Sequence, residues 1–237
     1  MGDYPLSCTL PCEVWVGAYL EGIFRVELFY FVVLFVLAFG LGACPFALWI
    51  GKWLLGKDIR NYGDGNPGAY NVMRAGGRWS FALALFLDMG KGVPFVALAH
   101  YYFGLPIGMV MVVGLSAILG HAFSPILRFN GGKALAVTGG VILALPQHEI
   151  FIAVVIFMFL AYLLIDVDAW RVTVAMTLTL IYLLLTKGFS LEPLFILCVM
   201  AILTVKHIED LRSTRPRFRG KLITWLQGRR TAHVSRH

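Results

Sequence analysis

The sequence predicts an all-α fold, a polytopic bundle of helices that cross a membrane. Of the 237 residues, 59% are hydrophobic and only 14% are charged, and the mean hydropathy is +0.79. A soluble globular domain carries about 25% charged residues. Long apolar runs and a one-sided distribution of positive charge support the same conclusion. The question is therefore how many helices cross the lipid.

Apolar runs follow one another along most of the chain. A helix needs about 20 apolar residues to cross a bilayer. The first run, 28–50, contains no charged residue, and the later runs become shorter. Short helices cross only where the bilayer thins or where they stay inside the bundle. We expect about seven helices, with five full spans as the alternative. The runs are 28–50, 80–103, 105–127, 132–145, 150–165, 172–186 and 191–205.

The distribution of Lys and Arg sets the expected orientation. If the loop 52–78 lies in the cytoplasm and the helices alternate from there, most of the 20 Lys and Arg residues are cytoplasmic. Only Arg25 and Lys187 fall on the outer side, while Lys91 lies within an apolar run. This asymmetry follows the positive-inside rule. It predicts an N-terminus outside and a C-terminus in the cytoplasm.

Three segments are expected on this basis. Residues 28–211 form the membrane domain, between an N-terminal extracytoplasmic or interfacial segment (1–27) and a basic cytoplasmic tail (212–237). Residues 14–26 fit a helix that lies in the membrane interface. Its aromatic anchors would be Trp15, Tyr19 and Phe24.

Composition also argues against two classes of function. The net charge of +7 is explained by membrane orientation, and no soluble surface is expected that could present a basic patch to nucleic acid. The four cysteines include no CxxC pair, and Cys44 and Cys198 lie in apolar runs. Small buried or interfacial cysteines explain this pattern, so no metal site is expected.

The first polar interruption of the apolar pattern is the segment 63–74, GDGNPGAYNVMR. Its glycines allow backbone N–H groups to approach a ligand closely and to form an anion-binding nest. Asn71 and Arg74 share a face if a helix begins after Pro67, and Arg74 would offer a planar donor fork to phosphate. The alternative is an ordinary cytoplasmic turn with an arginine that sets orientation.

Of two further interruptions, one lies inside an expected helix and the other at the start of one. Asp88 and Lys91 are three residues apart, so they form either a structural ion pair or the wall of a polar cavity. An ionisable residue inside a span costs about 2.5–3.5 kcal/mol and needs such a reason. His121 precedes a Gly-Gly-Lys sequence that opens a short helix, whose N-terminus attracts anions. Structural roles for His121 and an orientation role for Lys133 remain alternatives.

The last interruption, 206–212 (KHIEDLR), lies where the final helix meets the cytoplasm. All four interruptions fall on the side that the charge distribution assigns to the cytoplasm. A single membrane-facing site, rich in cations and glycine, would explain them together. Its expected ligand is anionic and phosphorylated.

These motifs resemble those of the PlsY-type acyl-phosphate:glycerol-3-phosphate acyltransferases. The segment 63–74 is similar to GSGNxGATNxxR, and 87–92 (LDMGKG) to LDxxKG. Residues 120–123 and 131–133 are similar to GHxF and GGK, and 207–212 to HRENIxR. Their order and separation agree from about residue 45 to residue 212.

The resemblance implies the function. The family transfers an acyl chain from acyl phosphate to glycerol 3-phosphate at the inner face of the bacterial cytoplasmic membrane, giving lysophosphatidic acid and phosphate. It implies a multi-pass protein in the lipid bilayer, with no cofactor, no metal and no obligate protein partner. The family is thought to need little or no general base. Orientation and charge stabilisation would do most of the work.

The resemblance also implies site residues. Catalytic or positioning roles fall on Asn71, Lys91, His121 and His207. Phosphate binding falls on Gly65, Asn66, Gly68, Arg74, Gly131, Gly132 and Lys133. Possible supporting residues are Asp64, Asp88 and Asp210.

Several positions depart from the family pattern. Asp64 replaces a serine, Tyr70 a threonine, Ala134 a glycine and Asp210 an asparagine, while Ile208 replaces an arginine. An expected Arg-aromatic-Val-Ser motif is not found near 166–173. Carboxylates beside a phosphate repel it unless a cation neutralises them. A paralogue with another phosphorylated acceptor, an inactive paralogue, a small lipid-handling transporter and a structural membrane subunit therefore remain alternatives.

Overall fold

The computed structural model describes residues 12–217, and their regular structure is helical apart from an isolated bridge at Ile165. This agrees with the predicted all-α class. The helices are α1 (Cys12–Ala43), α2 (Phe46–Leu55), α3 (Ala69–Arg74), α4 (Arg78–Gly90), α5 (Pro94–Ala97), α6 (Ile107–Ala122), α7 (Leu135–Ala144), α8 (His148–Leu164), α9 (Asp168–Lys187) and α10 (Leu191–Ser213).

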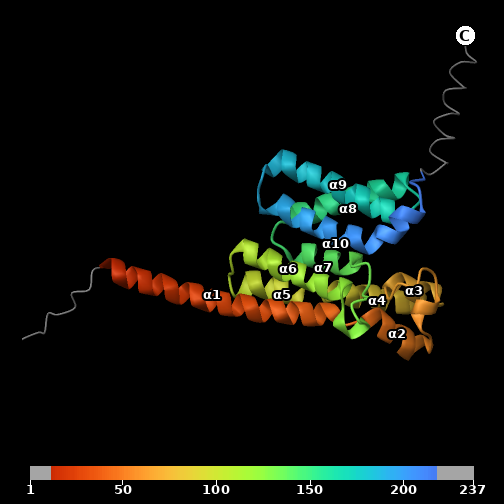
Figure 1. The fold of residues 1–237 in the computed structure, drawn as a ribbon, viewed down its shortest axis with the longest axis horizontal. Coiled ribbons are helices and arrows are strands. Elements are labelled where there is room, and N and C mark those ends of the chain that lie inside the picture. Colours follow the sequence, from red (N-terminus) through yellow and green to blue (C-terminus); the bar gives the residue numbers. More distant parts are fainter. Residues whose placement is uncertain (1–11, 218–237) are drawn as a thin grey trace, which may run out of the picture.

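Helix α1 is the longest element and extends beyond the rest of the bundle (Figure 1). Residues 14–26 are helical as expected, but they form the first part of α1 rather than a separate helix. Among the expected aromatic anchors, Phe24 is 55% exposed, while the side chains of Trp15 and Tyr19 lie outside the described residues. The same holds for the tail beyond residue 217.

Two of the predicted runs are each divided into shorter helices. The run 28–50 breaks at Cys44 and Pro45, where α1 ends and α2 begins. The run 80–103 breaks after Gly90, and Pro94 occupies the first turn of α5. Proline has no backbone N–H and disfavours helix in the residue before it, so both breaks follow from the sequence. A π-helix, η2 (Leu98–Tyr102), follows α5.

The number of candidate spanning segments matches the alternative prediction of five. Among the described residues, five helical segments are long and apolar enough to cross a membrane. Helices α7 and α8 are apolar but shorter. The five segments are Phe24–Leu55, Arg78–Tyr102, Ile107–Leu127, Asp168–Lys187 and Leu191–Ser213.

Glycines allow the helices that surround the site to pack closely. A Cβ on Gly42 of α1 would lie 2.2 Å from the Ala117 carbonyl oxygen of α6, and one on Gly140 of α7 would lie 1.9 Å from the Met89 carbonyl oxygen of α4. Small residues allow membrane helices to approach in this way. Helices α8, α9 and α10 form a neighbouring layer (Figure 1). The polar cavity lies where these two groups of helices meet.

Candidate active site

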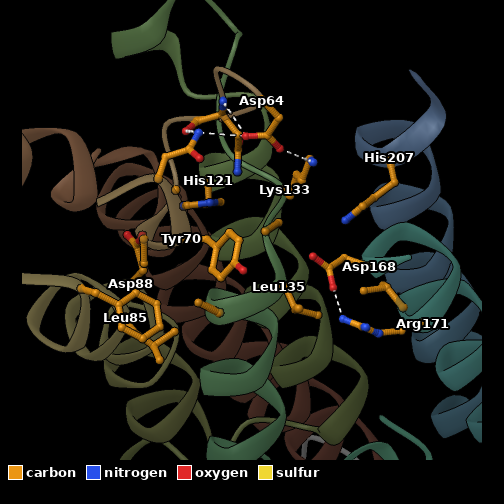
Figure 2. A pocket seen from close by; sticks show the side chains of 18 of the residues that line it. Asp64, Tyr70, Leu85, Asp88, His121, Lys133, Leu135, Asp168, Arg171 and His207 are labelled. Atoms are coloured by element: carbon orange, nitrogen blue, oxygen red, sulfur yellow. Dashed lines mark hydrogen bonds and ion pairs between the residues drawn. The ribbon is translucent and has the colours of Figure 1, made fainter. Parts of the chain in front are cut away.

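A cavity of about 570 Å³ gathers polar residues from four distant parts of the chain. It lies between the glycine loop before α3, the segment that leads into α7, the start of α9 and the end of α10. Figure 2 shows Lys133, Asp168 and His207 pointing toward a common space. The predicted site residues on its wall are Asp64, Asn66, Gly68, Asn71, Arg74, Asp88, His121, Lys133 and His207.

The glycine loop folds around the side chain of Asn71. Gly63 and Gly65 adopt positive φ angles of 61° and 74°, which glycine tolerates best. A Cβ on Gly63 would lie 1.9 Å from an Arg74 guanidinium nitrogen. Asn71 is buried, and its Nδ2 donates to Asp64 Oδ1 and to the Asn66 carbonyl oxygen, both at 2.8 Å. The loop therefore has a fixed shape, with Asn71 as its internal support.

Arg74 ends α3 and remains partly exposed at the cavity wall. Its Nη1 donates to Asn71 Oδ1 at 3.4 Å and lies 4.0 Å from Asp64 Oδ1. The guanidinium lies 4.8 Å from the centre of the Tyr70 ring, a cation–π distance. Tyr70, which departs from the family pattern, thus helps to orient Arg74. The remaining donors of Arg74 are available to an anion.

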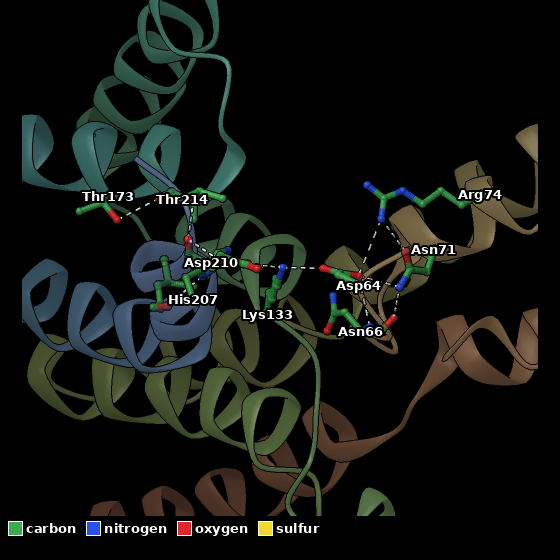
Figure 3. A network of polar contacts seen from close by, with 12 residues as sticks. Asp64, Asn66, Asn71, Arg74, Lys133, Thr173, His207, Asp210 and Thr214 are labelled. Carbon is green, nitrogen blue, oxygen red and sulfur yellow. Dashed lines mark hydrogen bonds and ion pairs between the residues drawn. The ribbon is translucent and has the colours of Figure 1, made fainter. Parts of the chain in front are cut away.

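Lys133 bridges the glycine loop and α10. Its Nζ lies 2.6 Å from Asp64 Oδ2 and 2.6 Å from Asp210 Oδ2. Figure 3 shows Lys133 between these two carboxylates. We call these three residues the carboxylate clasp. Partial burial disfavours the charged forms of Asp64 and Lys133, but hydrogen bonding outweighs this effect. The bonds from Lys133 and Asn71 lower the pKa of Asp64 to about 2, and the two carboxylates raise the pKa of Lys133.

Gly131 and Gly132 do not line the cavity, because they pack behind it against His121. A Cβ on Gly131 would lie 2.0 Å from the His121 carbonyl oxygen, and one on Gly132 would lie 2.4 Å from His121 Nε2. The Gly132 N–H also donates to the His121 carbonyl oxygen at 3.2 Å. These glycines therefore set the position of Lys133 and of the His121 ring. The next residue, Ala134, has a φ of 61° although it is not glycine.

His207 is buried on α10, one turn before Asp210 reaches Lys133. Its Nδ1 lies 2.8 Å from the Leu203 carbonyl oxygen. A carbonyl only accepts, so we assign the proton to Nδ1, which in the neutral ring leaves Nε2 with a free lone pair. His207 lines the cavity and can accept a hydrogen bond from a bound hydroxyl.

Asp88 and Lys91 form a buried ion pair rather than a pair of open ligands. Lys91 Nζ lies 2.9 Å from Asp88 Oδ1 and donates to the Cys44 carbonyl oxygen at 2.8 Å. The side chains are 3% and 0% exposed respectively. Asp88 touches the cavity wall, but Lys91 does not. This geometry favours the structural alternative, in which Lys91 ties α4 to the break between α1 and α2.

Sequence reasoning missed a third cation at the cavity, Arg171. It pairs with Asp168, donates to the carbonyl oxygens of Ile165 and Asp166, and lies 4.9 Å from the Tyr162 ring centre. The expected motif places Arg before an aromatic residue, whereas the chain reads Trp170-Arg171. An arginine in the first turn of a helix at the expected cytoplasmic side was the available signal.

An apolar groove of about 480 Å³ adjoins the polar cavity. It runs between α4, α7, α8 and α9. The two hollows share three wall residues, Leu135, Met158 and Tyr162. A molecule with a phosphate at one end and a long apolar chain could therefore occupy both. Among the described residues, no group of three His, Cys, Asp or Glu side chains is arranged to hold a metal ion.

Comparison with known proteins identifies the family. The family model described as glycerol-3-phosphate acyltransferase matches residues 32–215. The chain belongs to this family. The glycerol-3-phosphate acyltransferase of Enterococcus faecalis is 34% identical over 190 residues, which cover 76% of this chain and 87% of the relative. That of Staphylococcus aureus is 32% identical over 204 residues, covering 82% and 98%.

Solved structures from the acyltransferase family have a similar fold. The crystal structure of PlsY, an integral membrane glycerol 3-phosphate acyltransferase, in its glycerol 3-phosphate form matches with a TM-score of 0.70 and 28% identity. The match covers 82% of this chain and 98% of PlsY. The lysophosphatidic acid form matches with a TM-score of 0.68 and 27% identity. The resemblance found in the sequence motifs is thus confirmed at the level of family and fold.

Proposed function

We propose that the protein transfers an acyl chain from acyl phosphate to a hydroxyl of glycerol 3-phosphate. The hydroxyl oxygen attacks the acyl carbonyl carbon, a C–O bond forms, and the bond from that carbon to the phosphate oxygen breaks. The hydroxyl proton leaves with the phosphate. The products are lysophosphatidic acid and inorganic phosphate.

The observation that carries this proposal is the joining of the polar cavity to the apolar groove through Leu135, Met158 and Tyr162. Acyl phosphate needs such a pair of spaces, because its phosphate requires cations while its chain requires apolar walls. The acyl carbon then lies at the junction, within reach of the polar cavity. A soluble acceptor entering from the cytoplasm meets it there.

Arg74, Lys133 and Arg171 are the cations that bind the two phosphates. Arg74 and Arg171 each have a planar donor fork, which matches phosphate oxygens well. Asn71 holds the glycine loop, and Gly68 on the cavity wall keeps the backbone close to the acceptor, with Asn66 as an additional donor. Gly65 does not line the cavity and shapes the turn of the loop through its φ of 74°.

The chemistry relies on orientation. Phosphate is already a good leaving group, so positioning and charge stabilisation supply most of the acceleration. His207 accepts a hydrogen bond from the acceptor hydroxyl through Nε2, because Nδ1 is engaged by the Leu203 carbonyl. His121 orients the segment that carries Lys133.

The proposed location is the bacterial cytoplasmic membrane. The two shorter helices, α7 and α8, complete a seven-helix arrangement with the N-terminus outside and the C-terminus in the cytoplasm. The cavity then opens to the cytoplasm, where glycerol 3-phosphate is soluble. The Lys and Arg residues of loop 52–78 support this orientation.

The test is phosphate release from palmitoyl phosphate by the purified protein, with and without glycerol 3-phosphate. We expect release that depends on the acceptor, and a fall in kcat/KM of about 100-fold in Arg74→Ala, as for a lost electrostatic donor. Arg60→Ala is the matched control, because Arg60 pairs with Asp58 in the same loop and does not line the cavity.

Absence of release from a folded wild-type protein would contradict glycerol 3-phosphate as the acceptor. Release that is independent of acceptor would indicate hydrolysis instead. Equal losses in Arg74→Ala and Arg60→Ala would remove Arg74 from the proposed phosphate site.

A further inference from the structure

In the carboxylate clasp, Asp64 and Asp210 pair with Lys133, the cation that the proposed function assigns to phosphate. Lys133 Nζ is 2.6 Å from a carboxylate oxygen of Asp64 and 2.6 Å from one of Asp210. Two negative charges thus surround one positive charge. The Lys133 ammonium has three N–H donors and the two carboxylates engage two of them, so a phosphate oxygen can make only one hydrogen bond to Lys133 unless a carboxylate moves away. The phosphate also approaches two charges of its own sign.

The clasp is able to open because it is not buried. The side chains of Lys133, Asp64 and Asp210 are 27%, 36% and 37% exposed. Water can solvate the released carboxylates, so the desolvation that fixes a buried pair is largely missing. Asp64 retains other partners after release, since it accepts hydrogen bonds from Asn71 Nδ2 and from the Asn66 N–H.

We infer that Asp64 and Asp210 lower the affinity of the site for phosphate by competing with it for Lys133. The inference rests on the proposed function for its substrate, glycerol 3-phosphate. It goes beyond that function by assigning to this chain a weakened phosphate site, saturated only at high substrate concentration. Phosphate gains a further contact with Lys133 when Asp64 or Asp210 releases it.

The decisive variants are Asp64→Asn and Asp210→Asn. Asparagine keeps an oxygen at each position, so the Asn71 and Asn66 hydrogen bonds to residue 64 persist while the competing charge is lost. We expect each variant to lower the KM for glycerol 3-phosphate by about 1.5- to fivefold, the range for a partly exposed ion pair. The value of kcat should change less than the value of KM.

Asp58→Asn is the matched control. Asp58 lies in the same loop, its pKa is likewise lowered to about 2, mainly by its hydrogen bond with Arg60, and it does not contact Lys133. Removing its charge changes the overall electrostatics of the loop but leaves the clasp intact. KM should therefore remain at the wild-type value.

A binding measurement separates this inference from the proposed function. Isothermal titration calorimetry of inorganic phosphate with the purified protein in detergent requires no turnover. Asp64→Asn and Asp210→Asn should bind phosphate more tightly than the wild type and Asp58→Asn. If the wild type does not use glycerol 3-phosphate, the proposed function fails. The phosphate affinities still show whether Asp64 and Asp210 compete with phosphate for Lys133. Unchanged or weaker phosphate binding in both variants would overturn the inference. If Asp64→Asn proves unstable, Asp210→Asn decides alone, because it leaves the glycine loop untouched.

Discussion

The molecule contains two Asp–Lys pairings that look alike in sequence but differ in environment. Lys91 and Asp88 are buried, and Lys91 also donates to the Cys44 carbonyl oxygen. Lys133 has two carboxylate partners, yet all three side chains remain about a third exposed. The burial of an ion pair, rather than its distance, decides whether it fixes a fold or can exchange partners. The first pair is therefore structural, and the second is able to exchange partners.

The largest expected effect is on the buried pair. Lys91→Met leaves the Asp88 carboxylate without its cation inside the bundle. We expect a loss of about 3–5 kcal/mol in the free energy of unfolding, the usual result when one partner of a buried pair is removed. The measurement is denaturant unfolding of the purified protein in detergent.

The double variant Asp88→Asn/Lys91→Met is the control for this prediction. It removes both charges, so most of the lost stability should return, because no uncompensated charge remains. A loss of less than about 1 kcal/mol in the free energy of unfolding of Lys91→Met would contradict the structural role of the buried pair. The two pairings would then contribute similarly to stability.

The second prediction concerns Lys133, for which we expect the opposite pattern. Lys133→Ala should lower kcat/KM by about 100-fold, because it removes an electrostatic donor at the proposed phosphate site. Its effect on the free energy of unfolding should stay below about 1 kcal/mol, as for exposed pairs. Phosphate release and unfolding of the same sample provide both numbers.

Lys187→Ala is the matched control for Lys133→Ala. Lys187 pairs with Glu149 at 2.7 Å and lies at the opposite end of α9 from Asp168 and Arg171. Activity should remain at the wild-type level. If Lys133→Ala unfolded the protein as Lys91→Met does, the distinction between the two pairings would fail.

A smaller effect is expected from the backbone beside the clasp. Ala134 has a φ of 61°, a left-handed conformation that glycine adopts without a steric penalty. Ala134→Gly should therefore raise the free energy of unfolding by about 1 kcal/mol. The kcat should not change, because Lys133 keeps its position. Greater stability together with lost activity would mean that the strain itself positions Lys133.

The sequence predicted the class of fold well because hydrophobicity alone determines it. Proline chemistry also predicts the breaks at Pro45 and Pro94, although hydrophobicity alone predicts a continuous helix across each of them. Membership of the family was readable from motifs, and Asn71, Lys133 and His207 do meet at one cavity.

Two features could not be read from the sequence, for physical reasons. Whether Lys91 faces a cavity depends on how α4 packs against the break after α1, and spacing along one helix does not contain that information. The clasp joins residues 69 and 77 positions apart in the chain, so no local pattern pairs Asp64 or Asp210 with Lys133. Both carboxylates were expected beside phosphate, but their neutralisation by the same lysine depends on tertiary structure.

The smallest expected effect is the pH dependence of the clasp. Hydrogen bonding to Lys133 and Asn71 outweighs burial and lowers the pKa of Asp64 from 3.8 to about 2. Between these values the unfolded chain binds more protons than the folded protein, so stability rises with pH. The contribution of Asp64 is therefore complete above about pH 4 and is lost as the pH falls through about 2. The difference in Tm between wild type and Asp64→Asn should be constant from pH 8 to about pH 5 and should shrink only below about pH 4. A Tm difference that already changes near neutral pH would show that another titrating group controls the clasp. The pairing of Lys133 with Asp64 would then not be a simple exposed ion pair, and the contrast with the buried pair of Lys91 and Asp88 would fail.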